Sequence, residues 1–395
     1  MLLSPDTGAR TRGDVLITGA TGFLGMELMA RVLEDGDRRV WALVRSSDDA
    51  EAAERLRSTL SSLVPDPDAF ADRVVPVAGD LMLPGLGIDP RRRDELAEHV
   101  DEVIHSAASV SFTLPLDEAR AINLQGTRRV LELAGHVQAR GGLRRFAHVS
   151  TAFVAGTHEG VFGEDDLERG QGFHNTYERS KWEAERLVRD HAERLPVQLF
   201  RPSIVVGDER SGWTSSFNVI YTPLRAYARG ALPAVPARRS APVDIVPVSF
   251  VARAILALAD AGAGRSFTLA AGPEASTVGE LIKQAAGYLD QRPARVLPPS
   301  LYRRAVHPLL LRRAGAAQRR WLERGEVFFP YFASEVRFDT SAARAGLDPL
   351  GIRVPPVDAY LERLLEFAVR ANWGRCPVGR AEAGASAALP EPALA

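Results

Sequence analysis

Short apolar runs alternate with amphipathic stretches along the first half of the chain. Six runs have the length and the β-branched or aromatic content of buried strands, at 15–18, 40–45, 73–77, 102–105, 145–150 and 197–200. Apolar positions have helical spacing at 24–33, 49–63, 116–135 and 177–193. Strands that alternate with helices imply right-handed crossovers, so we expect an α/β fold with a doubly wound parallel sheet of the Rossmann type.

The regular alternation ends after Pro202. Prolines cluster at 223–247, and a basic amphipathic segment runs from 301 to 324. We expect this part to build a smaller C-terminal substrate-binding subdomain over the sheet. The predicted boundaries are an N-terminal extension at 1–12, a nucleotide-binding Rossmann domain at 13–205, a partly interleaved cap at 206–371, and a tail at 372–395 whose Ala, Gly and Pro content predicts disorder.

Composition excludes several classes of protein. Of the 395 residues, 46% are hydrophobic and 25% charged, as in ordinary globular proteins, and the net charge of −1 gives no bias toward nucleic acid or anionic lipid. The chain start lacks a signal-peptide pattern, and no run reaches the roughly 18 apolar residues of a membrane span. With the single Cys376 and no His, Cys and carboxylate cluster at metal spacing, we expect a cytoplasmic protein without disulfides or a metal site.

A glycine-rich turn follows the first expected strand and opens the first helix. Gly19, Gly22 and Gly25 have the spacing of a dinucleotide-binding fingerprint. Glycine adopts the unusual dihedrals of such a turn, and its missing side chain lets the backbone approach a pyrophosphate. The helix N-terminus adds unpaired N–H groups and partial positive charge. The pattern predicts a dinucleotide cofactor in preference to an ordinary glycine turn.

An arginine, and no carboxylate, ends the second expected strand. A carboxylate there would bind the ribose 2′-hydroxyl of NAD, whereas Arg45, followed by Ser46 and Ser47, suits the 2′-phosphate of NADP. A hydrogen bond to a charged group contributes about 1.5–3 kcal/mol, enough for a tenfold preference or more. We therefore expect NADPH. Arg55, on the next helix, is either a second phosphate ligand or a solvated helix residue.

Two other strand ends carry candidate cofactor contacts. Asp80, after the third strand, either accepts a hydrogen bond from the adenine amino group or shapes the turn of Gly-Asp-Leu. Ala107 and Ala108 follow the fourth strand, where small residues let the backbone lie against a cofactor. The strand histidines His105 and His148 are expected to be satisfied core residues.

Tyr177 and Lys181 are four residues apart on a predicted helix and so share a face. A nearby ammonium is expected to lower the tyrosine pKa from about 10 toward neutrality. Tyr177 would then donate a proton to a carbonyl oxygen as hydride arrives, and Lys181 would also hold the ribose hydroxyls. Thr151, just after the fifth strand, can orient the same oxygen, with Ser150 as the alternative hydroxyl.

Together these motifs resemble the extended short-chain dehydrogenase/reductases, and more narrowly the fatty acyl-CoA reductases and the thioester reductase domains of carboxylic acid reductases and nonribosomal peptide synthetases. The matching stretches are TGATGFLG at 18–25, ALVR at 42–45, GDL at 79–81, HSAASVSF at 105–112, NLQGT at 123–127, HVSTAFVAG at 148–156, NTYERSK at 175–181, RPSIVVGD at 201–208 and VDIVPV at 243–248. YFASEVRFDT at 331–340 is a weaker match to the region that follows the Rossmann core in acyl reductases.

The resemblance implies that Thr151, Tyr177 and Lys181 form a catalytic triad. It also implies further cofactor contacts, from Thr21, Phe23, Leu24 and Leu81 in the quoted motifs, from Asn123 beside the active-site helix, and from Pro202, Ser203 and Ile204 near the nicotinamide carboxamide.

The expected function is NADPH-dependent reduction of an acyl thioester, carried by coenzyme A or an acyl carrier protein, to an aldehyde and, with a second hydride, an alcohol. An alternative is an NAD(P)-dependent dehydrogenase or epimerase acting on a sterol-like alcohol or a nucleotide sugar. A third is a non-catalytic nicotinamide sensor or scaffold, which would not need the triad.

The basic segment at 301–324 contains three arginine pairs, Arg303-Arg304, Arg312-Arg313 and Arg319-Arg320. The simplest interpretation is a solvated helix face. The alternatives are a site for the phosphates of coenzyme A or a phosphopantetheine carrier, and peripheral contact with a membrane.

Overall fold

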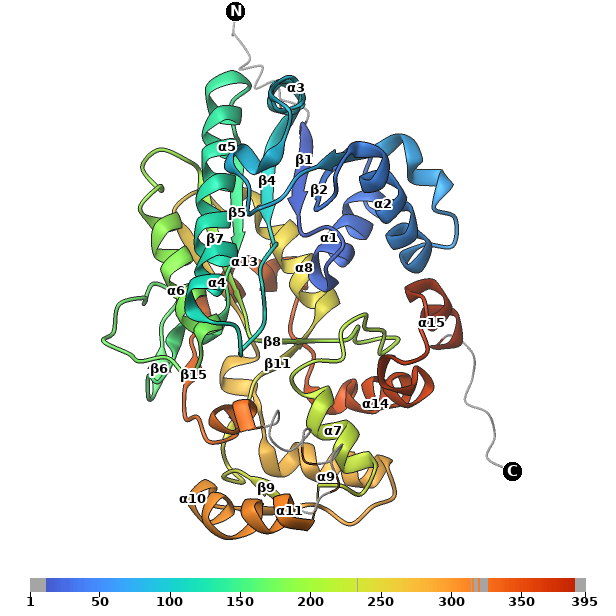
Figure 1. Ribbon diagram of the computed structural model, residues 1–395, viewed down its shortest axis with the longest axis vertical. Helices are drawn as coiled ribbons and strands as arrows, with labels where there is room; N and C mark the ends of the chain where they lie inside the picture. Colours follow the sequence, from blue (N-terminus) through green and yellow to red (C-terminus); the bar gives the residue numbers. More distant parts are fainter. Residues whose placement is uncertain (1–11, 233, 314, 316–318, 320–325, 388–395) are drawn as a thin grey trace, which may run out of the picture.

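A seven-stranded parallel sheet forms the centre of the upper part of the molecule in Figure 1. The computed structural model describes residues 12–387, apart from 233, 314, 316–318 and 320–325. The strand order is β12-β7-β5-β4-β1-β2-β3. These strands are β1 (Asp14–Thr18), β2 (Val40–Val44), β3 (Val74–Ala78), β4 (Val100–His105), β5 (Arg145–Val149), β7 (Val197–Pro202) and β12 (Arg265–Leu269).

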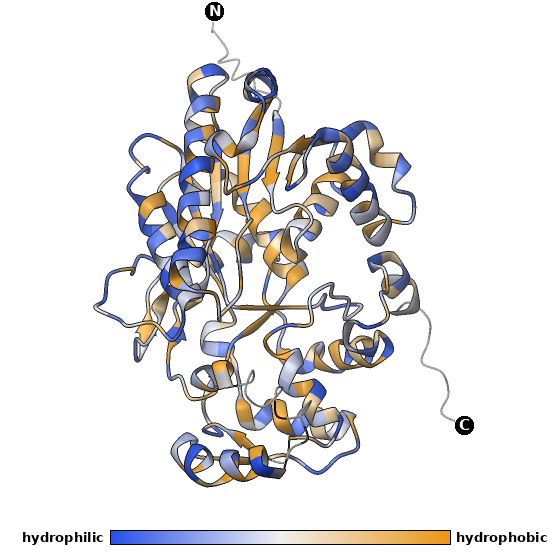
Figure 2. Ribbon diagram, viewed as in Figure 1, coloured by the Kyte–Doolittle hydropathy of each residue, from blue (hydrophilic) through white to orange (hydrophobic). Residues whose placement is uncertain are grey.

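Helices cover both faces of the sheet, so the prediction of a doubly wound α/β fold is confirmed. Val15 and Ile17 face a core shared with α1 (Phe23–Glu34), α2 (Asp49–Leu63) and α8 (Val248–Ala257). Leu16 faces the opposite core, shared with α3 (Pro90–His99), α5 (Gly126–Arg140) and α6 (Thr176–Arg189). Apolar residues accordingly follow the strands and the inner sides of these helices (Figure 2).

Six of the seven strands lie where the apolar runs predicted them. The seventh, β12, lies inside the region assigned to the cap and pairs with β7 in parallel register. The stretch predicted as one helix at 116–135 is α4 (Leu116–Arg120), a π-helical turn at Ala121–Gln125, and α5. Such π turns are rare and occur often at functional sites.

The cap lies below the sheet in Figure 1 and is built from short elements around its own apolar core. Its strands form small pairs: β8 (Ile204–Val206) with β11 (Ile245–Pro247), β9 (Ala234–Pro236) with β14 (Arg295–Leu297), and β10 (Pro242–Val243) with β13 (Ser276–Thr277). The other strands and α-helices of the described residues are β6 (Val161–Phe162) paired with β15 (Arg337–Phe338), α7 (Tyr221–Ala228), α9 (Val278–Tyr288), α10 (Pro299–Leu301), α11 (His307–Arg313), α13 (Ser341–Leu347), α14 (Leu361–Arg370) and α15 (Arg380–Ala387). A 3₁₀ helix at Glu326–Phe332 precedes β15.

The prediction of a disordered tail from residue 372 is wrong for the residues that the structure describes. A 3₁₀ turn at Asn372–Gly374 and α15 fold back toward the sheet domain. Arg380 pairs with Glu34 at 2.6 Å and with the buried Glu27 at 3.1 Å, and the Trp213 indole donates to the Val378 carbonyl at 3.1 Å. These contacts order a segment whose composition alone suggested flexibility. Residues 388–395, like 1–11, lie outside the described part.

Part of the basic segment also lies outside the described residues. In the described part of the segment at 301–324, four arginines are exposed, as expected for a solvated face: Arg303, Arg304, Arg312 and Arg319. None of the helices in the described part of the chain combines the length and the apolar character that a membrane crossing needs.

Candidate active site

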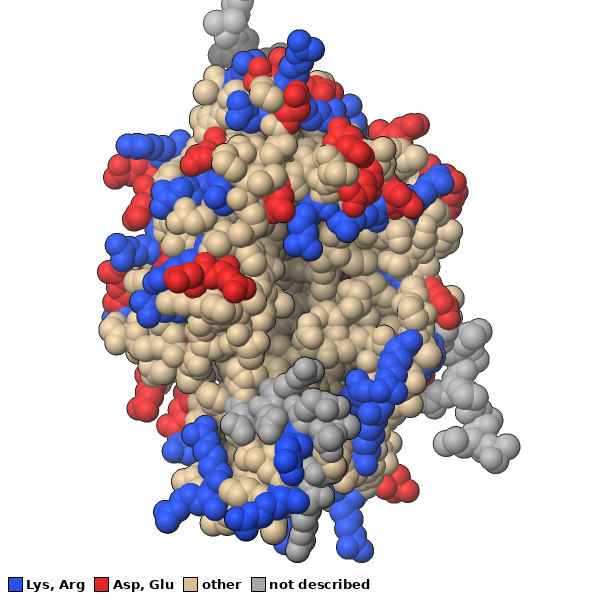
Figure 3. Space-filling model, viewed as in Figure 1, with Lys and Arg blue, Asp and Glu red and all other residues tan. Residues whose placement is uncertain are grey.

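A cleft of about 910 Å³ lies at the carboxyl ends of the sheet strands, between the sheet and the cap. Figure 3 shows the hollow at the centre of this face. All but one of the residues expected to act in catalysis or to bind cofactor line it: Gly19, Thr21, Gly22, Phe23, Leu24, Gly25, Arg45, Arg55, Asp80, Leu81, Ala107, Ala108, Thr151, Tyr177, Lys181, Pro202, Ser203 and Ile204. Carboxyl strand ends are where open α/β sheets bind their ligands.

The glycine turn is too tight for side chains. Gly19 has a φ of 77°, and a Cβ there would lie 2.8 Å from the Ala107 nitrogen. A Cβ on Gly25 would lie 2.0 Å from the Gly19 carbonyl oxygen. Gly22 is the N-cap of α1 and provides no side-chain cap, so the first amides of α1 are available at the cleft. These features suit the phosphates of a dinucleotide.

Two arginines lie at the β2 edge of the cleft. Arg45 directly follows β2, and Arg55 on α2 donates a hydrogen bond to the Arg45 carbonyl. The nearby acids Asp48 and Asp49 accept hydrogen bonds from the backbone amides of Glu51 and Ala78 and do not line the cleft. Asp80 is the one carboxylate among the described cleft residues, and it accepts from the Met82 amide at 2.8 Å. This hydrogen bond supports the interpretation of Asp80 as a residue that shapes the turn.

Helix α6 brings the two catalytic candidates into the cleft. Asn175 caps the helix by accepting from the Glu178 amide at 3.0 Å, which places Tyr177 in the first turn and Lys181 one turn later. The buried Lys181 ammonium donates to the Val149 carbonyl at 2.8 Å. Thr151 follows β5 and lines the same cleft. The three side chains thus converge from two elements on one space.

The ionisation of the tyrosine differs from the prediction. Burial raises the pKa of Tyr177 to about 12, which the Glu178 carboxylate reinforces and the Thr151 side chain opposes. Burial also lowers the pKa of Lys181 to about 8, against the effect of Glu185. The expected lowering of the tyrosine pKa fails because desolvation dominates and the ammonium is directed at the Val149 carbonyl. The protonated phenol is nevertheless the form that can donate a proton.

The alternative hydroxyl, Ser150, is engaged elsewhere. It donates to Glu185 at 2.6 Å, and Glu185 is paired with Arg201 at 2.6 Å in a fully buried cluster. The Thr151 hydroxyl instead accepts a hydrogen bond from the Phe153 amide at 3.3 Å and can still donate its own proton. This arrangement favours Thr151 as the group that orients a substrate oxygen.

Asn123 is the expected site residue that does not line the cleft. It lies on the π turn, accepts from the Ser109 amide at 2.8 Å and donates to the Ser180 hydroxyl at 2.9 Å. Asn123 therefore ties the segment after β4 to α6, the helix that carries Tyr177 and Lys181.

The two strand histidines differ from one another. The ring nitrogens of His105 lie 2.7 Å from the Thr18 hydroxyl and 2.9 Å from the Thr127 hydroxyl, and burial lowers its pKa to about 3. His148 is also fully buried, but neither of its ring nitrogens has a partner within the described residues. The prediction of a satisfied core residue is therefore wrong for His148.

An aromatic wall beside Tyr177 was not predicted. Tyr331 stacks on Phe112 with ring centres 5.5 Å apart and meets Phe153 edge-on at 5.0 Å. Its hydroxyl donates to the buried Glu178 carboxylate and accepts from the Asn175 amide group at 2.7 Å. In the sequence, the one indication that Tyr331 could belong to the site was its position at the start of the weak match at 331–340.

Comparison with known proteins adds a family match. The model of the NAD-binding family described as male sterility protein matches residues 17–255. One of the linear gramicidin synthase subunits of Brevibacillus parabrevis is 32% identical over 250 residues, which are 62% of this chain and 5% of that protein. The fatty acyl-CoA reductase wat of Drosophila melanogaster is 31% identical over 285 residues, covering 62% of this chain and 53% of that one. The chain thus spans about half of this reductase and a small part of the synthase.

Among solved structures, the terminal R domain of the myxalamid PKS-NRPS biosynthetic pathway has a TM-score of 0.79 and 28% identity, with 93% of each chain covered. UDP-glucuronic acid 4-epimerase from Bacillus cereus, in complex with NAD, is more distant, with a TM-score of 0.63 and 16% identity over 91% of this chain and 98% of that one. This second likeness shows a shared fold alone.

Proposed function

The chain belongs to the male sterility protein family of NAD-binding proteins, and on that premise we propose that it reduces an acyl thioester with NADPH. The observation that carries the proposal is the convergence of Thr151, Tyr177 and Lys181 on a cleft that the glycine turn also lines. The synthase, reductase and R-domain relatives support a thioester whose thiol is phosphopantetheine, on coenzyme A or on a carrier protein.

The side chains of the cleft suit carbonyl reduction. When bound, NADPH supplies the hydride that adds to the thioester carbonyl carbon. Thr151 and Tyr177 hydrogen-bond the carbonyl oxygen, and Tyr177 gives it a proton as negative charge develops, which leaves a hemithioacetal and a phenolate. In the resting site the Lys181 ammonium contacts the Val149 carbonyl, and we assign to it the stabilisation of the phenolate once that charge forms in the shared cleft.

Collapse of the hemithioacetal completes the reaction. The Tyr177 phenolate takes back the hydroxyl proton, the carbon–oxygen double bond re-forms, and the carbon–sulfur bond breaks. The thiolate leaves and is protonated by solvent. The products are an aldehyde and a free thiol, with one hydride and one proton consumed, and a second round on the aldehyde would give the alcohol.

We assign the choice of NADPH to Arg45 and Arg55, because both line the β2 edge of the cleft and the acids nearby are bound to backbone amides. We assign substrate binding to the cap at 206–371, because Ser215, Asn218 and Val219 of this region line the cleft.

The test is NADPH oxidation with a panel of acyl-CoAs and acyl carrier proteins, with products identified by mass spectrometry. We expect thioester-dependent turnover to aldehyde or alcohol. A Tyr177→Phe variant should lose at least 100-fold in kcat, the scale of a general acid, while its NADPH affinity stays within about twofold. Tyr288→Phe, an exposed tyrosine on α9, is the matched control and should retain full turnover. NADPH binding without turnover on any thioester would refute the proposal and lead to a screen of alcohols and nucleotide sugars.

A further inference from the structure

The general acid of the proposed reaction lies at the least constrained end of its helix. Tyr177 is in the first turn of α6, which starts at Thr176. The first amides of a helix have no partner within the helix, and helix ends fray. Lys181, one turn later, is held by its hydrogen bond to the Val149 carbonyl. Tyr177 therefore depends on contacts from outside the helix for a fixed position.

The hydroxyl of Tyr331 connects two side chains of this first turn. Asn175 caps α6, and its side-chain amide donates to that hydroxyl at 2.7 Å. The hydroxyl in turn donates to the carboxylate of Glu178, which also accepts from the His174 amide at 2.8 Å. Glu178 is fully buried and directly follows Tyr177 in the sequence. One hydroxyl from the cap thus binds the turn on both sides of the catalytic tyrosine.

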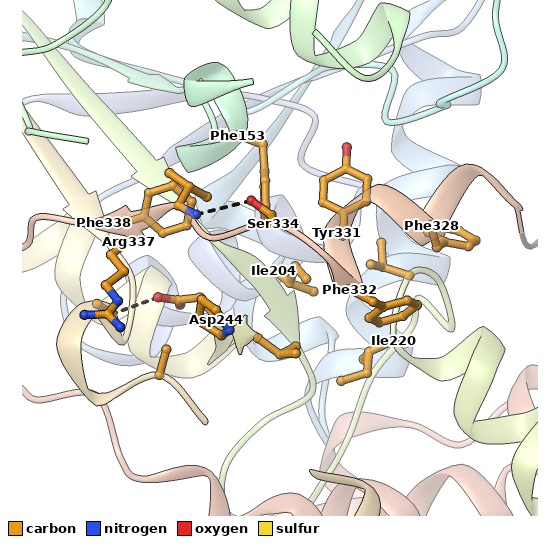
Figure 4. A pocket seen from close by; sticks show the side chains of 16 residues that line it. Phe153, Ile204, Ile220, Asp244, Phe328, Tyr331, Phe332, Ser334, Arg337 and Phe338 are labelled. Carbon is orange, nitrogen blue, oxygen red and sulfur yellow. Dashed lines mark hydrogen bonds between the residues drawn. The ribbon is translucent and has the colours of Figure 1, made fainter. Parts of the chain in front are cut away.

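Aromatic rings provide a second connection between the two tyrosines. The Phe112 ring stacks on Tyr331 with ring centres 5.5 Å apart, and its centre lies 5.6 Å from that of Tyr177. All three residues line the cleft. Tyr331 also lines a small cavity beside the cleft, and Figure 4 shows its hydroxyl directed away from two other residues of that cavity, Ile220 and Phe332. The ring therefore borders the open space, while the hydroxyl binds α6.

These contacts separate Tyr331 from the reacting atoms. A tyrosine hydroxyl has a single proton, and that of Tyr331 is donated to Glu178, so it is not available for a substrate oxygen. Glu178 does not line the cleft. Both residues can still affect the rate, because a misplacement of a catalytic group by about 1 Å can lower turnover about 100-fold.

We propose that Tyr331 is a positioning residue for the general acid: it fixes the first turn of α6 through Asn175 and Glu178, and so holds Tyr177 where it can give a proton to the carbonyl oxygen. The inference rests on the proposed reaction and deepens it, because a residue of the cap completes an active site whose catalytic side chains all belong to the sheet domain. The cap thereby contributes to the chemical step as well as to substrate binding.

The experiment compares four proteins, which are the wild type, Tyr331→Phe, Tyr177→Phe and the double variant. Tyr331→Phe keeps the ring and removes the hydroxyl. We expect it to lower kcat at least tenfold on the best thioester, while KM and the affinity for NADPH stay within about twofold. In the Tyr177→Phe background the same substitution should change the residual kcat by less than twofold, because no acid is left to position.

A matched control separates positioning from a general loss of stability. Tyr360 is also buried, and its hydroxyl donates to the Ile245 carbonyl at 3.0 Å, but it does not line the cleft. Tyr360→Phe therefore removes a buried hydroxyl that is bonded within the cap and should leave kcat within twofold. Urea unfolding and NADPH binding of every variant show that the proteins compared are folded.

The possible outcomes distinguish this inference from the proposed function. Full kcat in Tyr331→Phe, or an equal loss in the wild-type and Tyr177→Phe backgrounds, would overturn the positioning role and leave the reductase proposal standing. If the wild type reduces no thioester, the proposed function fails. The four proteins are then compared on an aldehyde or ketone that the wild type does reduce, where the same pattern of losses would support the role of Tyr331 and its absence would refute it.

Discussion

Arg45 and Arg55 are the cationic side chains at the β2 edge of the cleft, and both are exposed. Such residues can be predicted from sequence, because a strand end followed by a helix fixes their place whatever packs around them. The same holds for Thr151, Tyr177 and Lys181, since one follows a strand and two share a helix face. A property that depends on distant segments of the chain cannot be predicted in this way. Burial raises the pKa of Tyr177, and the spacing of Tyr177 and Lys181 carries no information about that burial.

The arginine at the end of β2 yields a prediction about cofactor choice. Arg45→Ala should raise the KM for NADPH at least tenfold and leave the KM for NADH within about twofold, because one charge-assisted hydrogen bond is worth about 1.5–3 kcal/mol. Steady-state kinetics with both cofactors would measure this. Arg57→Ala removes an arginine from the same helix that pairs with Asp68 away from the cleft, so it serves as control. An equal loss for both cofactors would contradict a role in 2′-phosphate binding.

The buried lysine yields a prediction about pH. In the proposed mechanism the protonated form of Lys181 stabilises the phenolate. Burial lowers the pKa of Lys181 from 10.5 to about 8, so this form is present below pH 8 and is lost as the pH rises through that value. We expect kcat to fall along an alkaline limb near pH 8. In Lys181→Arg, turnover should be lower, but the limb should vanish from the measurable range, because a guanidinium stays protonated. A limb at the same pH in the variant would assign it to another group.

At the scale of elements, α6 and the 3₁₀ helix at Glu326–Phe332 meet at the active site although they are far apart in the sequence. Glu178 is fully buried and accepts from the Tyr331 hydroxyl and from the His174 amide. The contact joins the catalytic helix to the cap through one carboxylate. This contact could not be predicted from the sequence, because the Tyr-x-x-x-Lys spacing assigns no partner to Glu178 and Tyr331 lies far along the chain.

A double-mutant cycle tests this connection. Tyr331→Phe should lower the free energy of unfolding by about 1.5–3 kcal/mol, because the buried carboxylate loses a donor. Glu178→Gln should also destabilise, and the double variant should lose less than the sum of the two, as expected for residues in direct contact. Urea unfolding of the four proteins gives the coupling energy. Additive losses would mean that the two side chains act independently.

The C-terminal helix supplies a second prediction at this scale. Arg380 is the second basic partner of Glu27, which also pairs with Arg31 at 2.7 Å. Arg380→Ala should therefore lower the free energy of unfolding by about 1–3 kcal/mol, the cost of leaving a buried charged group less satisfied. Arg375→Ala, at an exposed position just before α15, should change it by less than about 0.5 kcal/mol. Equal urea midpoints for Arg380→Ala and the wild type would show that the segment adds no stability.

At the scale of the whole molecule, the cleft lies where the sheet domain meets the cap. The sheet side could be predicted in detail, because strand ends and a glycine turn are local patterns. The cap side could not, because its apolar pocket between α7 and α9 is lined by residues such as Ile220, Ile282 and Phe332, which are distant in the sequence and carry no motif. Their apolar character is visible in the sequence, but their common pocket exists only once the chain has folded.

The late strand β12 has a consequence for how the protein is made. Its partner β7 ends at Pro202, and residues 203–264 must be synthesised before β12 can pair with it. At about 5–20 residues per second, the growing chain spends several seconds with the outer hydrogen-bonding groups of β7 uncovered. An uncovered strand edge is a template for pairing with other chains. Slower translation of residues 203–269 should therefore lower the yield of folded protein, unless a chaperone covers this edge until residue 269 has left the ribosome.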